Sequence, residues 1–210
     1  MQSRRRMPIR LDLVGVAYRR GMGEIQHRTA DELRAGLDEI GRSPVDDGTL
    51  ELIVRRPDVD VREVLAEGEL DVAEGLVGDN WSRRPSSTTA DGSPHPDMQL
   101  TLINSRLLAL ISPDPERRAL AGDQLAVDLS LSPDDLPVWS RLRIGDAVLE
   151  VTDQPHIGCS KFTQRFGLDA LRFVNSEEGR AVNLRGINAR VVVPGTIHQG
   201  DRITVEHPTS

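Results

Sequence analysis

The first clear pattern of apolar and polar positions along the chain is helical. Within the stretch 29–41 (TADELRAGLDEIG) apolar residues recur three or four positions apart, which places them on one helix face: Leu33, Leu37 and Ile40. A threonine and, three positions later, a glutamate form a capping-box pattern, and a glycine follows the last apolar position. The turn-like stretch 43–48 comes next. We therefore predict a helix over 29–41, in an N-terminal extension that comprises residues 1–47.

After residue 48 the period changes from helical to alternating. Short segments with apolar residues at every second position predict strands at 49–56, 98–104, 124–131, 141–144, 147–152, 189–193 and 202–206. Gly145-Asp146 is a hairpin signal of the two-residue type, and Pro194-Gly195 marks another tight turn. Strands this short, with turns this frequent, usually close into a barrel or a sandwich. The predicted fold class is therefore mainly β.

The segments between the predicted strands differ in character. Three of them favour helices that cover the sheet at its periphery: 61–68, 105–112 and 160–175. The stretch 82–97 (SRRPSSTTADGSPHPD) has no periodicity and is rich in Ser, Thr and Pro, which predicts a long surface loop.

Composition narrows the class of protein. The chain has 210 residues, a formal net charge of −7 and one cysteine. An acidic chain lacks the basic surface that releases counterions from nucleic acid, so no nucleic-acid partner is expected. No apolar run approaches the roughly 20 residues of a membrane helix, and charged residues interrupt the opening run before any signal-peptide cleavage site. A lone cysteine suits a reducing compartment. We expect a soluble, cytoplasmic protein with no membrane partner.

The cysteine lies in the stretch 155–167 (PHIGCSKFTQRFG), at the start of a predicted helix. Lys161 and Arg165 are four positions apart and share one helix face, and a helix N-terminus favours a nearby anion. Such neighbours would lower the pKa of the Cys159 thiol below its ordinary value of about 8.5, as a nucleophile or a metal ligand requires. The alternative is a small buried apolar residue, which is a common role of free cysteine. The sequence leaves both open.

His156 precedes the cysteine by three positions in a loop that contains a proline and a glycine. It is a candidate general base or a second residue beside the thiol, although a loop histidine is more often a hydrogen-bonded surface residue. The five histidines and the cysteine show none of the close ligand pairs of a structural zinc site.

The segment 75–84 (GLVGDNWSRR) is a second candidate site. Gly78 and Asp79 precede two arginines, Arg83 and Arg84, and a glycine-containing loop can bind an anion through its backbone N–H groups. The phosphate-loop and dinucleotide signatures are absent. The alternative is a strand-to-loop turn with solvated arginines.

These pieces, in their order along the chain, resemble the MOSC domain, which is named for the carboxy-terminal part of molybdenum cofactor sulfurase. The matching pieces are 75–79 (GLVGD), 99–104 (QLTLIN), 122–137 (GDQLAVDLSLSPDDLP), 141–152 (RLRIGDAVLEVT), 159–162 (CSKF), 165–167 (RFG) and 179–201 (GRAVNLRGINARVVVPGTIHQGD). The ordered combination is far more specific than any one piece. The resemblance covers residues 48–206, which we take as the MOSC domain.

The resemblance implies a mainly β fold with peripheral helices and a barrel similar to the β-barrel domain of pyruvate kinase. It also implies binding of the molybdenum cofactor (molybdopterin) or a related pterin. The family's cysteine matches Cys159, which is implied either to carry sulfur as a persulfide or to ligate molybdenum, as the corresponding thiolate does in the related amidoxime reductases. A soft thiolate suits molybdenum, and a persulfide suits sulfur donation.

Two motifs depart from the family's pattern. Gly78-Asp79-Asn80 stands where many members have Gly-Asp-Arg, and Gly122-Asp123-Gln124 stands where many have Gly-Glu-Asn. Other cations are available to meet an anionic ligand, with Arg84 among them. The predicted cofactor-binding residues are Gly78, Asp79, Arg83, Lys161, Arg165, Arg185 and Arg190. We expect Cys159 near the mouth of a cleft bounded by the segments 75–84 and 179–190.

Three functions stay open on the sequence alone. The first is cofactor binding with Cys159 in sulfur transfer or metal ligation. The second is a molybdenum-dependent reductase of small N-hydroxylated compounds that takes electrons from a redox partner. The third is a non-catalytic module that carries the cofactor. The chain is too short for an aminotransferase-like desulfurase domain, so pyridoxal phosphate would belong to a separate cysteine desulfurase partner.

Overall fold

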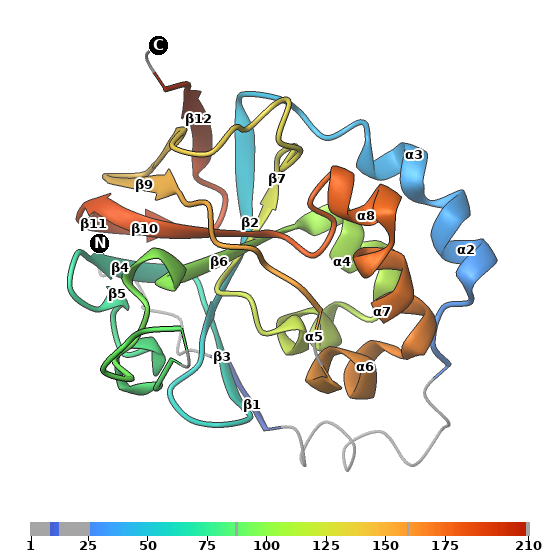
Figure 1. Ribbon diagram of the computed structural model, residues 1–210, viewed down its shortest axis with the longest axis horizontal. Helices are drawn as coiled ribbons and strands as arrows, with labels where there is room; N and C mark the ends of the chain where they lie inside the picture. The colour runs from blue at the N-terminus through green and yellow to red at the C-terminus, as the bar shows by residue number, and fades with distance from the viewer. Residues whose placement is uncertain (1–8, 13–25, 87, 159, 209–210) are drawn as a thin grey trace, which may run out of the picture.

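Seven strands close into a barrel in the computed structural model, which describes residues 9–12, 26–86, 88–158 and 160–208 (Figure 1). Around the barrel the order is β2 (Gly48–Arg55), β12 (Arg202–Glu206), β8 (Arg141–Ile144), β9 (Ala147–Val151), β10 (Ile187–Val193), β6 (Leu100–Asn104) and β7 (Leu125–Asp128), which pairs again with β2. These pairings are antiparallel except that of β6 with β7. The prediction of a mainly β fold with a barrel is confirmed.

Further strands extend the barrel sheet and form a second, smaller sheet. At one side of β2 lie β3 (Val61–Leu65) and then β1 (Ile9–Asp12). The smaller sheet consists of β11 (Gly195–His198), β4 (Glu67–Asp71) and β5 (Gly75–Leu76). The predicted hairpin joins β8 to β9 through two residues, and its Gly145 has a φ of 54°, which favours glycine.

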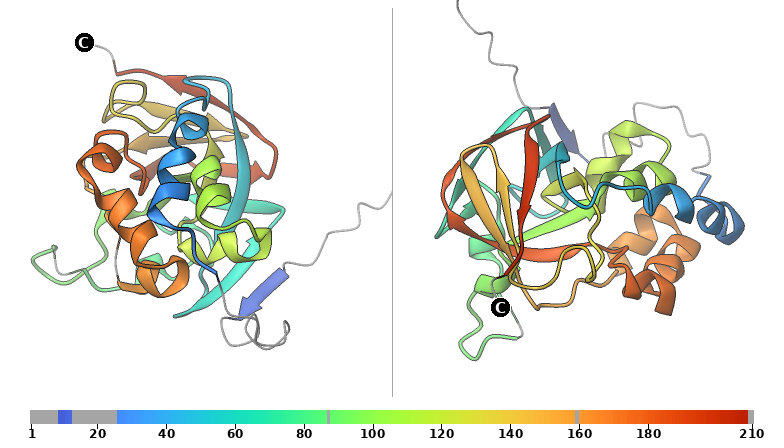
Figure 2. Two further views of the ribbon diagram at one scale, coloured as in Figure 1. Left: turned by 90° about the vertical axis from the view of Figure 1, so that its right-hand side faces the viewer. Right: turned by 90° about the horizontal axis from the view of Figure 1, so that it is seen from above.

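The helices gather on one side of the barrel, as Figure 2 shows from two further directions. They are α2 (Ala30–Ala35), α3 (Leu37–Ile40), α4 (Ser105–Ile111), α5 (Pro115–Arg118), α6 (Ser160–Phe166), α7 (Leu168–Asn175) and α8 (Glu177–Ala181). Short 3-10 helices lie in the loops, namely η1 (Trp81–Arg83), η2 (Pro96–Met98) and η3 (Ala119–Ala121). Across the described ranges, no helix has the length and apolar character needed to cross a membrane.

Alternation along β6 and β7 gives the molecule two apolar cores. Leu102 on β6 and Leu125 on β7 point into the barrel, whereas Ile103 and Ala126 point outward and pack with the helices. The outer core also contains Leu33 of α2 and the aromatic pair of α6. The helical layer is therefore attached to the barrel through β6 and β7.

The helix predicted over 29–41 is two short helices. The predicted capping box is present, because Thr29 accepts a hydrogen bond from the backbone of Glu32 and the glutamate accepts one in return. The helix ends at Ala35, and α3 follows after Gly36, whose added Cβ would collide with Leu110 of α4. Close packing at a glycine thus accounts for the break.

The helix predicted over 61–68 is wrong. This segment forms β3 and the start of β4, and β3 pairs on both sides. The apolar positions 61, 64 and 65 are compatible with a helix face, so their spacing alone could not separate the two structures. Pairing with β2 and β1 selects the strand, which is a tertiary effect.

The helix predicted over 160–175 is interrupted. Gly167 has a φ of 92°, outside the helical region, and separates α6 from α7. The other predicted strands and the helix 105–112 occur within a few residues of their predicted bounds.

Candidate functional site

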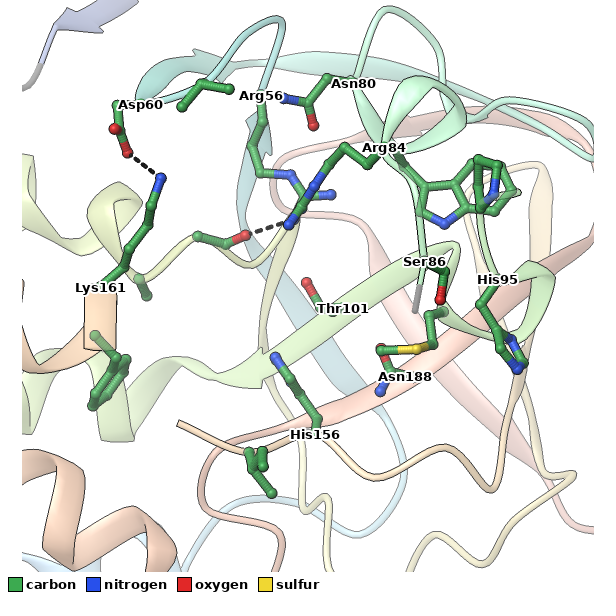
Figure 3. A pocket seen from close by; sticks show the side chains of 18 of the residues that line it. Arg56, Asp60, Asn80, Arg84, Ser86, His95, Thr101, His156, Lys161 and Asn188 are labelled. Carbon is green, nitrogen blue, oxygen red and sulfur yellow. Dashed lines mark hydrogen bonds and ion pairs between the residues drawn. The ribbon is translucent and has the colours of Figure 1, made fainter. Parts of the chain in front are cut away.

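A cleft of about 460 Å³ lies beside β6 and β10, where the loop between β2 and β3 approaches the first turn of α6 (Figure 3). The loop 80–98 forms another wall. The basic side chains that line the cleft are Arg56, Arg62, Arg84, His95, His156, Lys161, Arg165 and Arg185. The carboxylates on the same surface are Asp58 and Asp60. The cleft is therefore electropositive within an acidic protein.

Arg56 is fixed by the buried carboxylate of Asp79. This carboxylate accepts hydrogen bonds from the Arg56 backbone N–H at 2.8 Å and from its guanidinium at 2.8 and 3.0 Å. It also accepts one from the backbone N–H of Trp81 at 2.9 Å. Arg56 donates a further hydrogen bond to the Gly122 carbonyl at 2.9 Å. Asp79 therefore ties the loop after β5 to the end of β2 and positions an arginine that faces the cleft.

A second buried ion pair fixes Arg185. Its guanidinium lies 2.9 Å from both carboxylate oxygens of Asp123 and 4.9 Å from the centre of the Phe162 ring. Burial alone would raise the pKa of Asp123, but the charge and hydrogen bonds of Arg185, together with the other basic groups nearby, outweigh it and the net pKa is lowered. The carboxylate is therefore ionised at neutral pH and neutralises this arginine.

The third group of cations is less well neutralised. Arg165 and Lys161 share one carboxylate, that of Asp60, at 2.8 and 3.0 Å. Arg62 is buried, and its guanidinium donates to the carbonyl of Val61, but no described carboxylate lies within ion-pair distance of it. Burial, and then repulsion by Arg165 and another arginine, lowers the pKa of Arg62 to about 10. The guanidinium stays charged at neutral pH, with no ion-pair partner among the described residues.

His156 is largely buried and neutral at physiological pH. Burial, together with the positive charge of Arg185, lowers its pKa to about 3. Its Nδ1 is 3.6 Å from a carboxylate oxygen of Asp123, which is too long for a hydrogen bond. A neutral imidazole can donate or accept a single hydrogen bond at each nitrogen, which suits ligand binding or base chemistry.

Several cleft side chains have a buried polar atom with no hydrogen-bond partner among the described residues. These atoms are Arg62 Nε, Asn80 Oδ1, His156 Nδ1, Arg185 Nε and Asn188 Oδ1. Each unpaired buried group costs about 1–3 kcal/mol. Their concentration around one cavity indicates that a polar ligand would satisfy groups that the protein itself leaves unpaired.

Cys159 itself lies outside the described residues. The residues on both sides of it in the sequence line the cleft, namely His156, Ile157, Lys161 and Phe162. The preceding backbone is held by α7, because the side chain of Asn175 accepts a hydrogen bond from the Gly158 N–H at 3.0 Å and donates one to its carbonyl at 3.4 Å.

The other predicted site residues fall into two groups. Lys161, Arg165 and Arg185 line the cleft, and Asp79 acts on it through Arg56. Gly78 has a φ of 80° in the adjoining turn. Arg83 does not line the cleft and donates to the Pro57 carbonyl at 2.7 Å. Arg190 lies elsewhere, paired with Glu150 and Asp97.

Sequence reasoning missed several cleft residues, above all Arg56, Arg62, Asp60 and Asn188. Arg62 fell within the segment that was predicted as a helix, and Arg56 stood at the end of a predicted strand with no motif around it. The arginines at both ends of the loop 57–60 were the available signal, because a strand end places side chains beside a barrel's opening. No group of three His, Cys, Asp or Glu that could hold a metal ion occurs in the part of the chain that the structure describes.

The fold and this cleft define a barrel protein with an electropositive ligand site. A family model described as the MOSC domain matches residues 95–204, which is more than half of the chain, so the chain belongs to the MOSC domain family. This domain is associated with binding of the molybdenum cofactor or with sulfur transfer.

Solved structures with TM-scores above 0.5 share the fold. The YuaD protein from Bacillus subtilis has a TM-score of 0.53 and 18% identity, over 77% of this chain and 97% of that one. A hypothetical protein has a TM-score of 0.52 and 19% identity, over 79% of this chain and 70% of its own. YiiM from Escherichia coli has a TM-score of 0.49 and 19% identity, over 77% of this chain and 71% of its own. No curated protein matches the chain.

Proposed function

We propose that the chain binds the molybdenum cofactor, or a related pterin, in the cleft, and that Cys159 either carries sulfur or ligates molybdenum. The observation that carries the proposal is the set of buried, unpaired polar atoms in a cleft with surplus positive charge. Such a cavity fits a ligand with an anionic group and several hydrogen-bonding atoms. The family association is consistent with that ligand.

The chain's own residues would divide the binding between two ends of the cleft. Arg62, Arg165 and Lys161 would meet the anionic part of the ligand. His156 and Asn188, which Figure 3 shows on the side of the cleft away from Asp60, would form hydrogen bonds with its uncharged polar atoms. The bound cofactor would supply a molybdenum centre, and a nearby thiolate or persulfide is chemically suited to it.

Cofactor content of the purified protein tests the proposal. The chain would be produced in a host that makes the cofactor, and molybdenum and pterin would be measured per protein molecule. We expect both in wild type and a strong loss of both in Arg62→Gln. The matched variant Arg190→Gln changes an arginine that is paired outside the cleft and should retain the cofactor. Absence of molybdenum and pterin from wild type would contradict the proposal.

The two roles of Cys159 give different results in the same preparation. A metal ligand predicts that Cys159→Ala lowers the molybdenum content and that the protein, with an electron-donor partner, reduces small N-hydroxylated compounds. A sulfur carrier predicts a mass increase of one sulfur atom at Cys159 after incubation with a cysteine desulfurase and free cysteine, because the thiolate takes the outer sulfur of the desulfurase persulfide and releases the desulfurase thiol. If neither is seen and Cys159→Ala functions normally in cells, the remaining alternative is a non-catalytic cofactor carrier.

A further inference from the structure

The loop between β2 and β3 places the carboxylate of Asp60 beside two cations of α6 that line the cleft. Asp60 accepts a hydrogen bond from Lys161 Nζ at 3.0 Å, which Figure 3 shows, and one from Arg165 Nη2 at 2.8 Å. The hydrogen bond from Lys161, and then the positive charges of Lys161 and Arg165, lower the pKa of Asp60, so the carboxylate is charged at neutral pH. It acts as the counter-ion of two residues on α6.

The ion pairs of Asp60 with Lys161 and Arg165 are more exposed than the other ion pairs around the cleft. Asp79 and Asp123 are fully buried at 0% and 1% side-chain exposure, whereas Asp60 is 44% exposed. Asp60 also has a φ of 59°, which is uncommon for a residue with a side chain. A partly exposed carboxylate on a short loop can leave its partners at a lower cost than a buried one.

The charges around the cleft indicate which kind of ligand group would replace the Asp60 carboxylate beside Lys161 and Arg165. Five described cations, namely Arg56, Arg62, Lys161, Arg165 and Arg185, face four carboxylates, namely Asp58, Asp60 and the buried Asp79 and Asp123. Among these residues one positive charge is in surplus, and two are in surplus once Asp60 is displaced. Arg62 Nε is buried without a partner in the same region. A dianion with several acceptor oxygens would neutralise the surplus and satisfy that donor.

We infer that the carboxylate of Asp60 is an internal competitor that a dianionic, tetrahedral oxyanion group of the ligand displaces from Lys161 and Arg165. The inference rests on the proposed function, because it concerns the anionic part of the same ligand. Asp60 then makes the cleft selective for dianions: a monoanion gains too little from the cations to replace an existing carboxylate, whereas a dianion gains about twice as much.

Binding of inorganic oxyanions tests the inference without the cofactor. Phosphate and molybdate would be titrated calorimetrically at constant ionic strength, with perchlorate as a tetrahedral monoanion. Asp60→Asn removes the competing charge and keeps a residue type that tolerates positive φ. We expect this variant to bind phosphate about tenfold more tightly than wild type and to discriminate less between phosphate and perchlorate. Asp58→Asn, which removes a charge two positions away that is not paired with α6, should raise the affinity less than Asp60→Asn does.

The outcomes separate this inference from the proposed function. Equal or weaker phosphate binding by Asp60→Asn, or an equal gain in Asp58→Asn, would overturn the displacement of Asp60. Failure of both wild type and Asp60→Asn to bind any of the oxyanions would also overturn it. Molybdenum and pterin content, measured on the same preparations, decides the proposed function independently. Asp60→Gly, which also accepts a φ of 59°, replaces the asparagine variant if that protein folds poorly.

Discussion

At the scale of single residues, the cleft is a place where the protein leaves charges and polar atoms unpaired. Arg62 has no described carboxylate partner, and His156 and Asn188 each retain an unpaired buried atom. Behind them, Asp79 neutralises Arg56 and Asp123 neutralises Arg185. These ion pairs hold the wall in place, and the unsatisfied atoms belong to residues that line the space where a ligand would bind.

The low pKa of His156 predicts a contribution to the pH dependence of stability. The folded pKa of about 3 lies below the unfolded value of 6.5, so the unfolded chain takes up a proton first as pH falls. Stability is therefore lost below about pH 6.5. Between about pH 7.5 and about pH 5.5 wild type should lose about 1 kcal/mol more unfolding free energy than His156→Gln, as measured by urea titration. Identical pH dependence of the two proteins would show that His156 titrates normally.

The buried ion pair of Asp79 with Arg56 is predicted to contribute more to stability than an exposed ion pair does. Asp79→Asn weakens four hydrogen bonds to a buried carboxylate and leaves Arg56 with an uncompensated charge, so it should cost about 3 kcal/mol of unfolding free energy. Asp31→Asn removes a carboxylate from an exposed pair with Arg34 and is the matched control, with little effect expected. Equal urea midpoints for the two variants would contradict the structural role of Asp79.

At the scale of elements, strand ends and glycine turns decide which residues reach the cleft. Gly186 connects Arg185 to the first residue of β10 and has a φ of 103°. An added Cβ there would collide with the carbonyl oxygen of Leu102 on β6 and would lie 3.3 Å from His156 Nδ1. The backbone at this position therefore touches both the barrel wall and the cleft.

Alanine at Gly186 is predicted to be far more costly than alanine at Gly92. Both glycines have a positive φ, but no heavy atom lies within 4 Å of a Cβ built on Gly92. Gly92→Ala should lose about 1 kcal/mol through backbone strain alone. Gly186→Ala adds a collision with backbone and should lose more than about 2 kcal/mol, measured by urea unfolding followed by circular dichroism. Similar losses would mean that the chain relaxes around Gly186 without cost.

At the scale of the whole molecule, the N-terminal extension shares a core with the rest of the chain. Leu33 of α2 is fully buried with α4, α6 and α7 residues, and Ser43 accepts a hydrogen bond from Asn104 at 2.8 Å. The predicted boundary between the extension (1–47) and the MOSC domain (48–206) stays a prediction. The shared packing leads us to expect that both parts unfold together as one cooperative unit.

Leu33→Ala tests whether the extension and the barrel unfold together. Loss of a fully buried leucine should cost about 3 kcal/mol, in a single transition seen by both circular dichroism and tryptophan fluorescence. Leu168→Ala, at a position 49% exposed, is the matched control and should have a small effect. Two separate transitions, with only the first one shifted by Leu33→Ala, would show that residues 1–47 fold independently.

The sequence by itself determined the class of fold, most of the strands and the family. Period-two alternation marks a strand wherever one face is buried, and the ordered motifs around Cys159 identify the MOSC domain. It also led to Lys161 and Arg165 through their spacing on one helix face and to Arg185 through the family pattern, and all three line the cleft.

Only the tertiary structure decided which further residues meet those three in the cleft. Closure of the barrel brings Arg56, Asp60 and Arg62 next to α6, about a hundred positions away in the chain. Local periodicity reports contacts between residues two to four positions apart, and it was ambiguous for 61–68, where pairing with β2 and β1 selected the strand. The charge surplus of the cleft is a property of that assembly, because each arginine taken alone in the sequence is equally compatible with a solvated surface.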